Sequence, residues 1–345
     1  MQRVALIGCG FMGGMHASVY PALADACLVA VVDPREEAAR EILNARGLGG
    51  VPIYADYDQA ARECDFSVAD ICLPTDLHRT VALSAFAGGH HVFCEKPISL
   101  TIEDARAMTA AARDAGRELM IGHCIRFRPE YRELEKWVRS GRAGALLGLE
   151  LGRRSGRPDY SVGDWVNRPE RCVGAALDLH IHDTDFIVHL LGTPDAVFSR
   201  GTQDGTGWSG IATHYLYDRF VVTASGGWNS PPRWGFQMRF DAVFENGSLD
   251  FDSRRNPTLR QTSGREEPSD LILPKLPANP VASGGNITDL GGYFQELAYF
   301  VDCLENGKRV SISSGDQATE SLRVVLAEIE SAASGKLVSL NMRTS

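Results

Sequence analysis

The sequence lacks the marks of several protein classes. Its eight cysteines include no C-x-x-C pair, so neither a zinc ribbon nor a redox dithiol is indicated and reduced thiols are expected. No apolar run approaches the ~20 residues that cross a membrane. No basic run with interleaved aromatic residues occurs, and the net charge of −9 argues against a nucleic-acid partner. We find neither internal repeats nor a low-complexity tract.

These absences leave a globular protein with 44% hydrophobic residues, enough for a large core. The first apolar strand begins at Arg3, which leaves no room for a signal peptide. We therefore expect a cytoplasmic protein with no membrane partner.

The length of 345 residues favours two domains. Over residues 1–123, short apolar runs alternate with helical patterns at 34–46, 78–87 and 101–115. The strand-like runs are "RVALIGC", "LVAVVD", "VADICLP", "HHVFCEK" and "ELMIGH". Strands that are apolar on both faces and alternate with helices predict a parallel sheet covered by helices.

The pattern changes over residues 124–345. Longer alternating runs appear in "LLGLELGRR", "IATHYLYDRFVVTASGGW" and "FQMRFDAVFENGSLDFD". Helices are expected at 129–140, about 175–191, 293–304 and 316–333, and a loop is expected at 263–285. These features predict an α+β domain built on a large, mainly antiparallel open sheet.

The segment "GCGFMG" places Gly8, Gly10 and Gly13 directly after the first strand and before a helix. A lone G-x-G-x-x-G is a weak signal, but between a strand and a helix it is the dinucleotide fingerprint. The first glycine permits the tight turn, the second lets the backbone approach a pyrophosphate, and the third lets helix and strand pack closely. The helix N-terminus then offers N–H donors to the phosphates.

Asp33 ends the second apolar run, 20 residues after Gly13. An acidic residue there accepts hydrogen bonds from the ribose hydroxyls, which favours NAD over NADP. An ordinary carboxylate at a strand end is the alternative. Arg35 leaves NADP open, because an arginine at this place could meet a 2′-phosphate.

Two further strand-like runs lead into polar residues. "VADICLP" is followed by Thr75, and "HHVFCEK" ends in Glu95 and Lys96 before Pro97. Ligands of open α/β sheets bind at the carboxyl ends of the strands. The pattern therefore directs Lys96 towards the nicotinamide end of the cofactor and the substrate oxygen.

A third segment, "GAALDLHIHDTDF", is expected to be helical, with Asp178, His182 and Asp185 on one face. His180 would project about 160° away from His182 at 100° per residue, so this pair is badly placed to chelate a metal and no metal site is expected. An intrahelical hydrogen bond is the plain alternative for Asp178 and His182. Ionisable groups in so apolar a helix nevertheless need a reason, because burying them unpaired is costly.

Taken together, these motifs resemble the Gfo/Idh/MocA family, named after glucose–fructose oxidoreductase, inositol dehydrogenase and a rhizopine-catabolism protein. The resemblance extends over nearly the whole chain and also includes "GHCIRFRPEY" and the closing "GGYFQELAYFVDCLENGK". It implies a Rossmann domain followed by a domain whose open sheet often serves in oligomer contacts, and often a cis peptide bond before Pro97. One departure is His180, where many members carry glycine.

The resemblance also implies site residues. Lys96, Asp178 and His182 match the family's catalytic lysine, aspartate and histidine. The residues expected to contact the cofactor are Gly8, Gly10, Phe11, Met12, Gly13, Asp33, Pro34, Arg35, Leu73, Pro74, Thr75, His78, Glu95, Lys96 and Arg126. The residues expected to contact the substrate are Lys96, Arg126, Trp165, Asp178 and His182.

The leading hypothesis is an NAD-dependent oxidoreductase, with NADP possible, that acts on a cyclic polyol, a sugar or a sugar derivative and forms a homodimer or homotetramer. A second keeps the fold and changes the substrate to a dihydrodiol or to an aldose oxidised at its anomeric carbon. A third, from another class, is a regulatory protein that binds NAD without turnover. Such a protein need not retain a lysine, an aspartate and a histidine together.

Overall fold

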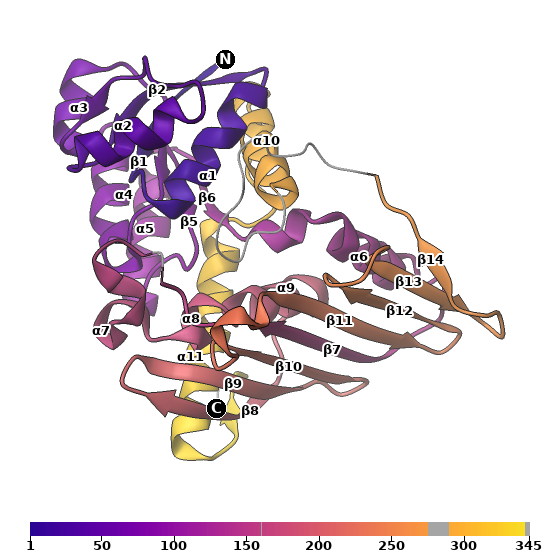
Figure 1. The fold of residues 1–345 in the computed structure, drawn as a ribbon. Helices are drawn as coiled ribbons and strands as arrows, with labels where there is room; N and C mark the ends of the chain where they lie inside the picture. The colour runs from indigo at the N-terminus through magenta and orange to yellow at the C-terminus, as the bar shows by residue number, and fades with distance from the viewer. Residues whose placement is uncertain (160, 275–289, 342–345) are drawn as a thin grey trace. The chain divides into compact units, whose positions relative to one another are not determined.

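The structure is a computed structural model that describes residues 1–159, 161–274 and 290–341 (Figure 1). Its contacts divide the chain into two compact units. The first unit holds the described residues of Met1–Phe127, Tyr160–Val166 and Leu276–Thr319, and the second holds those of Arg128–Asp159, Asn167–Lys275 and Glu320–Ser345. In these described parts, no helix combines the length and the apolar character needed to span a membrane.

The first unit contains a six-stranded sheet in the order β3-β2-β1-β4-β5-β6, with every pair of neighbours parallel. Its strands are β1 (Gln2–Ile7), β2 (Ala26–Val32), β3 (Ile53–Tyr54), β4 (Val68–Ile71), β5 (His91–Glu95) and β6 (Leu119–Gly122). The strand order reverses between β1 and β4, which makes their carboxyl ends the switch point of a Rossmann sheet. The predicted parallel sheet is confirmed.

The helices of the first unit mostly follow the sequence pattern. They are α1 (Phe11–Val19), α2 (Glu36–Asn44), α3 (Tyr57–Glu63), α4 (His78–Ala87), α5 (Ile102–Asp114) and α10 (Gly291–Glu305), with short 3-10 turns η1 (Tyr20–Ala22), η2 (Thr75–Leu77) and η3 (Cys124–Phe127). Thr101 caps α5 by accepting a hydrogen bond from the Asp104 N–H at 3.2 Å. The sequence analysis missed β3 and α3, because a two-residue edge strand and a seven-residue helix carry little periodic signal.

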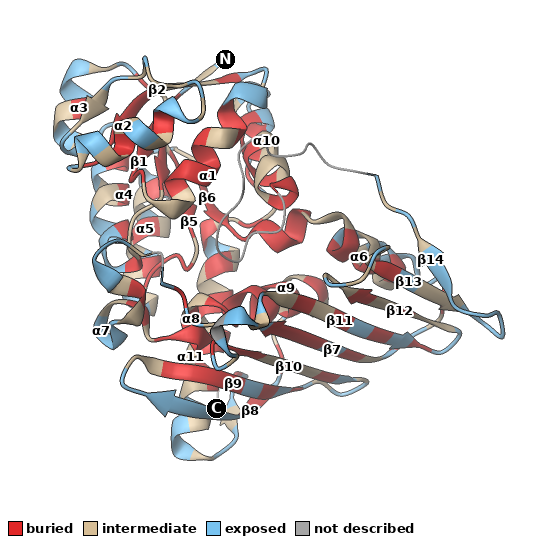
Figure 2. Ribbon diagram, in the orientation of Figure 1, coloured by how far each residue is buried: buried red, intermediate tan, exposed pale blue. Residues whose placement is uncertain are grey.

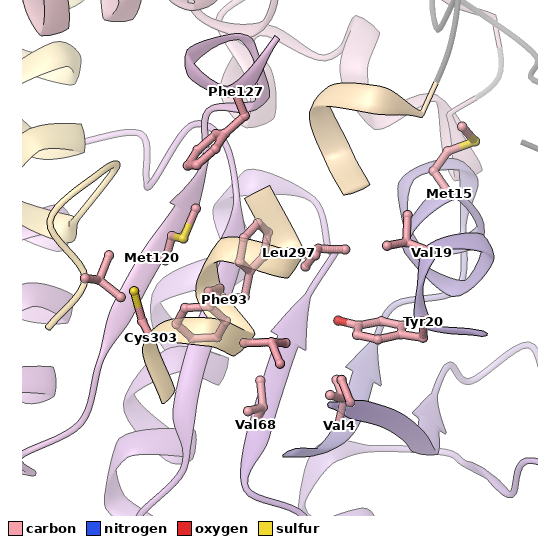
Figure 3. Packing of buried hydrophobic residues seen from close by; sticks show 14 of the residues in the cluster. Val4, Met15, Val19, Tyr20, Val68, Phe93, Met120, Phe127, Leu297 and Cys303 are labelled. Carbon is pink, nitrogen blue, oxygen red and sulfur yellow. The ribbon is translucent and has the colours of Figure 1, made fainter. Parts of the chain in front are cut away.

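Helix α10 packs in the core of the first unit although it lies far along the chain. Leu297 and Cys303 of α10 share one apolar cluster with Met15 of α1 and Phe93 of β5 (Figure 3). Phe300 meets Phe93 edge to face, with ring centroids 5.7 Å apart. The face of the sheet that carries Phe93 therefore depends on a helix more than 160 residues beyond β6 for its cover.

The second unit contains a nine-stranded sheet in the order β14-β13-β12-β11-β7-β10-β9-β8-β15. Its strands are β7 (Leu146–Arg154), β8 (Ala196–Asp204), β9 (Gly207–Leu216), β10 (Val221–Gly227), β11 (Gln237–Phe244), β12 (Gly247–Asp252), β13 (Leu259–Ser263), β14 (Ser269–Leu271) and β15 (Val338–Ser339). Among the strands that the structure describes here, only the β7–β10 pair is parallel, so the predicted mainly antiparallel sheet is confirmed.

One face of this sheet is covered and the other is open. Buried and exposed residues alternate along β9 and β11 (Figure 2). On the covered face, Tyr131 of α6 (Pro129–Ser140) packs against the rings of Phe240 and Phe251, and helices α8 (Ala175–Asp178) and α11 (Gly315–Ser334) pack on β9. The remaining elements of the unit are α7 (Pro169–Cys172), α9 (Ile181–Leu191) and the 3-10 turn η5 (Pro232–Trp234), while η4 (Val162–Asn167) lies where the chain passes between the units.

Two expectations for the second unit are wrong. The single helix expected at 175–191 is two helices, α8 and α9, because the His180 N–H bonds to the Ala175 carbonyl five residues back at 2.8 Å and widens the turn. The loop expected at 263–285 contains strand β14, whose polar residues pair only with β13 at the sheet edge. Residues 275–285 of that loop lie outside the described part of the chain.

Candidate functional site

The glycine-rich turn between β1 and α1 has a conformation that only glycine can provide. Gly8 has a φ of 95°, and a Cβ there would lie 2.6 Å from the Cys72 carbonyl oxygen. A Cβ on Gly13 would lie 1.9 Å from the Gly8 carbonyl oxygen. Gly8 therefore serves the turn and Gly13 the close packing of helix on strand. Gly10, Phe11 and Met12 are partly exposed at the start of α1.

Asp33 is joined to this turn. Its Oδ2 accepts a hydrogen bond from the Cys9 N–H at 3.0 Å, which ties the end of β2 to the glycine-rich loop. Burial opposes its ionisation, but the bonds from Arg35 and from the backbone outweigh burial and hold the pKa of Asp33 below its usual value. The carboxylate therefore stays negative beside the glycines, where a ribose would offer hydroxyl donors.

Arg35 holds both oxygens of the same carboxylate. Its Nε donates to Oδ1 at 2.9 Å and its Nη2 donates to Oδ2 at 2.7 Å, while Pro34 between the two residues is exposed. In the sequence analysis Asp33 favoured NAD and Arg35 left NADP open, but in the structure the two side chains form an ion pair. Arg35 therefore competes with a ribose for hydrogen bonds to Asp33.

The segment after β4 lies across the switch point from the glycine-rich turn. Leu73 and Pro74 are half-buried, and Thr75 is buried. His78 at the start of α4 connects this segment with the end of β5, because its Nε2 lies 2.9 Å from the Leu73 carbonyl oxygen and its Nδ1 lies 3.0 Å from that of Pro97. Burial lowers the pKa of His78. The histidine thus fixes two loops at the carboxyl edge of the sheet.

Lys96 follows β5 at the same edge. Its side chain is half-buried, and the Lys96–Pro97 peptide bond is cis. The Lys96 N–H donates to Oε2 of Glu95 at 3.2 Å. The Glu95 carboxylate is buried inside the unit, where it supports the backbone of Lys96, and its contact with the cofactor stays a prediction.

Arg126 and Trp165 also belong to the first unit. Arg126, on η3, is buried and its Nη1 donates to Oε1 of Gln317 at 2.7 Å. Trp165 is half-buried on η4. The sequence analysis missed Val162, which lies on the same segment and approaches the glycine-rich turn. One of its methyl groups lies 3.9 Å from where a Cβ on Gly10 would be. An exposed valine in a Gly- and Pro-rich stretch carries no local signal of that approach.

Asp178 and His182 belong to the second unit. Asp178 is the last residue of α8 and is half-buried, while His182 stands in the first turn of α9 and is 9% exposed. Asp185 does not share their role, because it is fully buried and accepts a hydrogen bond from the Ser321 hydroxyl at 2.7 Å. The predicted catalytic residues are therefore divided between the units, with Lys96 in the first.

His180 has a structural place. Its Nε2 lies 2.7 Å from Oε2 of Glu328 on α11, and both side chains are fully buried. A Cβ on Gly226 of β10 would lie 3.1 Å from the His180 Nδ1, so the glycine makes room for the ring. The residue that departs from the family pattern thus anchors the start of α9 to α11.

Comparison with known proteins agrees with this geometry. Residues 2–123 match the family model described as "Oxidoreductase family, NAD-binding Rossmann fold", and residues 131–250 match the "GFO/IDH/MocA C-terminal domain". The chain belongs to the Gfo/Idh/MocA oxidoreductase family. The predicted resemblance is confirmed over both parts of the chain.

Similar proteins within this family act on polyols and sugars. The inositol 2-dehydrogenase of Rhizobium meliloti (strain 1021) is 26% identical over an alignment that covers 98% of this chain and 99% of that protein. The scyllo-inositol 2-dehydrogenase (NAD(+)) of Bacillus subtilis (strain 168) is 25% identical, with 99% and 97% covered. A solved levoglucosan dehydrogenase in complex with NADH and levoglucosan has a TM-score of 0.85 at 22% identity, with 99% and 100% covered, which shows a common fold.

The first unit fits a nicotinamide dinucleotide. The loop turns tightly at Gly8 and packs closely at Gly13, while a Cβ on Gly10 would meet nothing nearer than a Val162 methyl at 3.9 Å. Asp33 stands beside this loop as a hydrogen-bond acceptor. Sequence analysis named these residues, but it missed His16 and Glu296, which are buried close to Glu95. The signal that could have found them is the same in both cases: His16 in α1 and Glu296 in α10 are each an ionisable residue in a largely apolar helix.

Proposed function

We propose that this chain is an NAD-dependent dehydrogenase that oxidises a CH–OH group of a cyclic polyol or sugar. The observation that carries the proposal is the junction of Asp33 with the glycine-rich turn, at the same sheet edge as Lys96. The names of the inositol dehydrogenases and of the levoglucosan dehydrogenase support an inositol-like or sugar substrate.

The first unit binds the cofactor, and the second unit contributes His182 and Asp178 to the reaction of the substrate. When bound, the nicotinamide supplies the acceptor for the hydride that leaves the carbinol carbon. His182 takes the hydroxyl proton on a ring nitrogen, and the Lys96 Nζ holds the same oxygen as negative charge develops. Asp178 orients His182 and stabilises its protonated form. Positioned acid–base groups of this kind contribute roughly 10²–10⁴-fold each.

The remaining predicted contacts follow from this arrangement. The start of α1 binds the pyrophosphate through Gly10, Phe11 and Met12, and Pro34 and Arg35 border the ribose. The segment from Leu73 to Thr75, fixed by His78, borders the nicotinamide half. Arg126 and Trp165 lie on the first unit and border the substrate together with Lys96.

The second unit serves assembly through the open face of its sheet. Leu216 and Val221, which pair across β9 and β10, are 37% and 63% exposed, and Phe198 on β8 is 36% exposed. The middle of the face is charged, where Arg239 pairs with Glu150 and Asp241. An open nine-stranded face with apolar residues at its margin fits a homodimer or homotetramer contact.

We also place the enzyme in the cytoplasm. None of the eight cysteines forms a disulfide, and five of them are buried, as expected where thiols stay reduced. Fractionation of cells that express the natural chain would test the location.

A substrate screen tests the function. Purified protein is mixed with NAD or NADP and with cyclic polyols, aldoses and anhydrosugars, and absorbance of the reduced cofactor is followed. We expect turnover of at least one polyol or sugar with NAD. NADH binding without turnover of any tested alcohol would favour the non-catalytic alternative.

A further inference from the structure

Four ionisable side chains meet in the interior of the first unit, and we call them the acid cluster: His16 of α1, Asp70 of β4, Glu95 of β5 and Glu296 of α10. All four are between 0% and 4% exposed. They lie beside the apolar cluster that joins α1, α10 and the sheet, where Tyr20 and Leu297 pack (Figure 3). The proposed function uses Lys96, next to Glu95, and leaves the cluster unexplained.

His16 connects two of the carboxylates. Its Nδ1 lies 2.9 Å from Oδ2 of Asp70, and its Nε2 lies 3.1 Å from Oε1 of Glu95. The Tyr20 hydroxyl donates to the same Asp70 oxygen at 2.6 Å. The other Glu95 oxygen accepts the backbone N–H of Lys96. A line of hydrogen bonds therefore runs from Asp70 through His16 and Glu95 to the backbone of Lys96.

Glu296 has a different position in the cluster. One of its carboxylate oxygens lies within 4.8 Å of a His16 ring nitrogen and of a Glu95 oxygen. Among the described residues, neither Glu296 oxygen has a hydrogen-bond partner, and the residue is fully buried. A carboxylate that is sealed from water and unpaired is costly when it is charged.

Charge balance decides which groups carry protons. Three ionised carboxylates around one imidazolium would leave two net negative charges in an apolar core, whereas a neutral Glu296 leaves one. Burial first, and then the charge of Glu95, raise the pKa of Glu296 well above its usual value. Burial lowers the pKa of His16, but Asp70 and Cys72 outweigh it and hold that pKa well above the usual value. The other titratable groups around the cluster are Tyr20, Cys72, Cys124 and Tyr293.

A metal ion could also balance this charge, since His16, Glu95 and Glu296 offer three ligand atoms. The geometry favours protons, because both ring nitrogens of His16 are already within hydrogen-bond distance of a carboxylate oxygen. A metal between His16 and Glu95 would have to replace one of these bonds.

We propose that Glu296 is a positioning residue that works in its protonated form. As a neutral acid it places no second negative charge beside Glu95, whose Oε2 holds the backbone of Lys96. When Glu296 ionises as the pH rises, repulsion between the two carboxylates loosens that hold. This inference rests on the proposed role of Lys96 in catalysis.

Thermal unfolding tests the protonation state without a substrate. A folded-state pKa above the usual value of 4.5 means that stability is fullest below that value and falls as pH rises towards the folded pKa. Glu296→Gln removes this loss, so its Tm relative to wild type should rise by at least about 2 °C between about pH 6 and about pH 9. Glu103→Gln on the exposed face of α5 is the matched control and should show no such slope.

Kinetics test the connection to Lys96. Loss of kcat at alkaline pH should be weaker in Glu296→Gln than in wild type, while Glu296→Ala should lower kcat about tenfold and change KM little. The effect of Glu296→Gln on the alkaline loss should disappear in a Glu95→Gln background, because Glu296 acts through Glu95.

The outcomes separate the two proposals. A Tm difference that is the same at all pH values, or a tightly bound divalent metal found by elemental analysis and lost in Glu296→Gln, would overturn the inference. A Tm difference that widens with pH, without turnover of any polyol or sugar, would support a neutral Glu296 and contradict the proposed function. An alkaline loss of kcat identical in wild type and Glu296→Gln would overturn the positioning role.

Discussion

The proposed chemistry depends most on two residues, Lys96, which holds the substrate oxygen, and His182, which takes the hydroxyl proton. Lys96 stands at the carboxyl end of β5, and His182 stands in the first turn of α9. They come from different units, so each needs its own support: the Glu95 carboxylate on one side and the His180–Glu328 pair on the other. Catalysis by such groups depends on their placement more than on their number.

We expect Lys96→Ala and His182→Ala each to lower kcat by roughly 10²–10⁴-fold on a confirmed substrate. NADH affinity, measured by fluorescence titration, should fall much less, because the contacts of Gly10 and Asp33 remain. Asp178→Asn should also lower kcat, and its effect should not add fully to that of His182→Ala. Oxidation should slow at low pH, where the base is protonated. Near wild-type kcat in His182→Ala would place the general base elsewhere.

Asp33 should decide the choice of cofactor. Its buried, negative carboxylate repels a 2′-phosphate and accepts from ribose hydroxyls, so we expect kcat/KM for NAD to exceed that for NADP. Asp33→Ala should lower the NAD value by about 10–100-fold and the NADP value less. Steady-state kinetics with both cofactors measure this, with Arg35→Ala as the companion variant. A clear NADP preference of the wild type would mean that Arg35 outweighs Asp33.

At the scale of elements, the joint between α8 and α9 is held by a buried polar network. Glu328 of α11 lies 2.7 Å from His180 and accepts hydrogen bonds from the Thr184 and Thr213 hydroxyls at 2.8 and 2.9 Å. Strand β9, helix α9 and helix α11 therefore meet at one carboxylate. The network holds His180, the residue before α9, which lies two residues before His182.

Breaking this network should destabilise the second unit. We expect Glu328→Leu to lower the free energy of unfolding by about 3–5 kcal/mol, because it removes the buried carboxylate that His180 and the two threonine hydroxyls share. Chemical denaturation followed by circular dichroism measures the change. Glu330→Leu at an exposed position of the same helix is the matched control and should stay within about 0.5 kcal/mol of wild type. Similar losses for both variants would mean that the network adds nothing to stability.

At the scale of the whole molecule, the open face of the nine-stranded sheet is the feature that the described residues leave without cover. We expect a particle of about two or four times 37.5 kDa by light scattering at micromolar concentration. Val221→Glu together with Leu216→Glu should shift the particle towards the monomer, while Glu103→Gln should not. A wild-type monomer would contradict the proposed assembly.

The sequence by itself determined the elements whose signals are local. The glycines of "GCGFMG" are required by contacts within a single strand–turn–helix unit, and α4 and α6 begin and end where the pattern predicts, at His78–Ala87 and Pro129–Ser140. The sheet class of each unit followed from hydrophobic periodicity, which reflects whether one face or both are buried. Asp33 and Lys96 were found because strand ends of a parallel sheet share one edge.

Only the tertiary structure decided the rest. Helix α10 covers the first sheet and brings Glu296 to Glu95, a contact between residues 201 positions apart in the chain that no local pattern encodes. The break between α8 and α9 came from a backbone bond and from the pairing of His180 with Glu328, again between distant residues. Periodicity reports which residues are buried, whereas the choice of partner for a buried charge depends on which distant segments pack together.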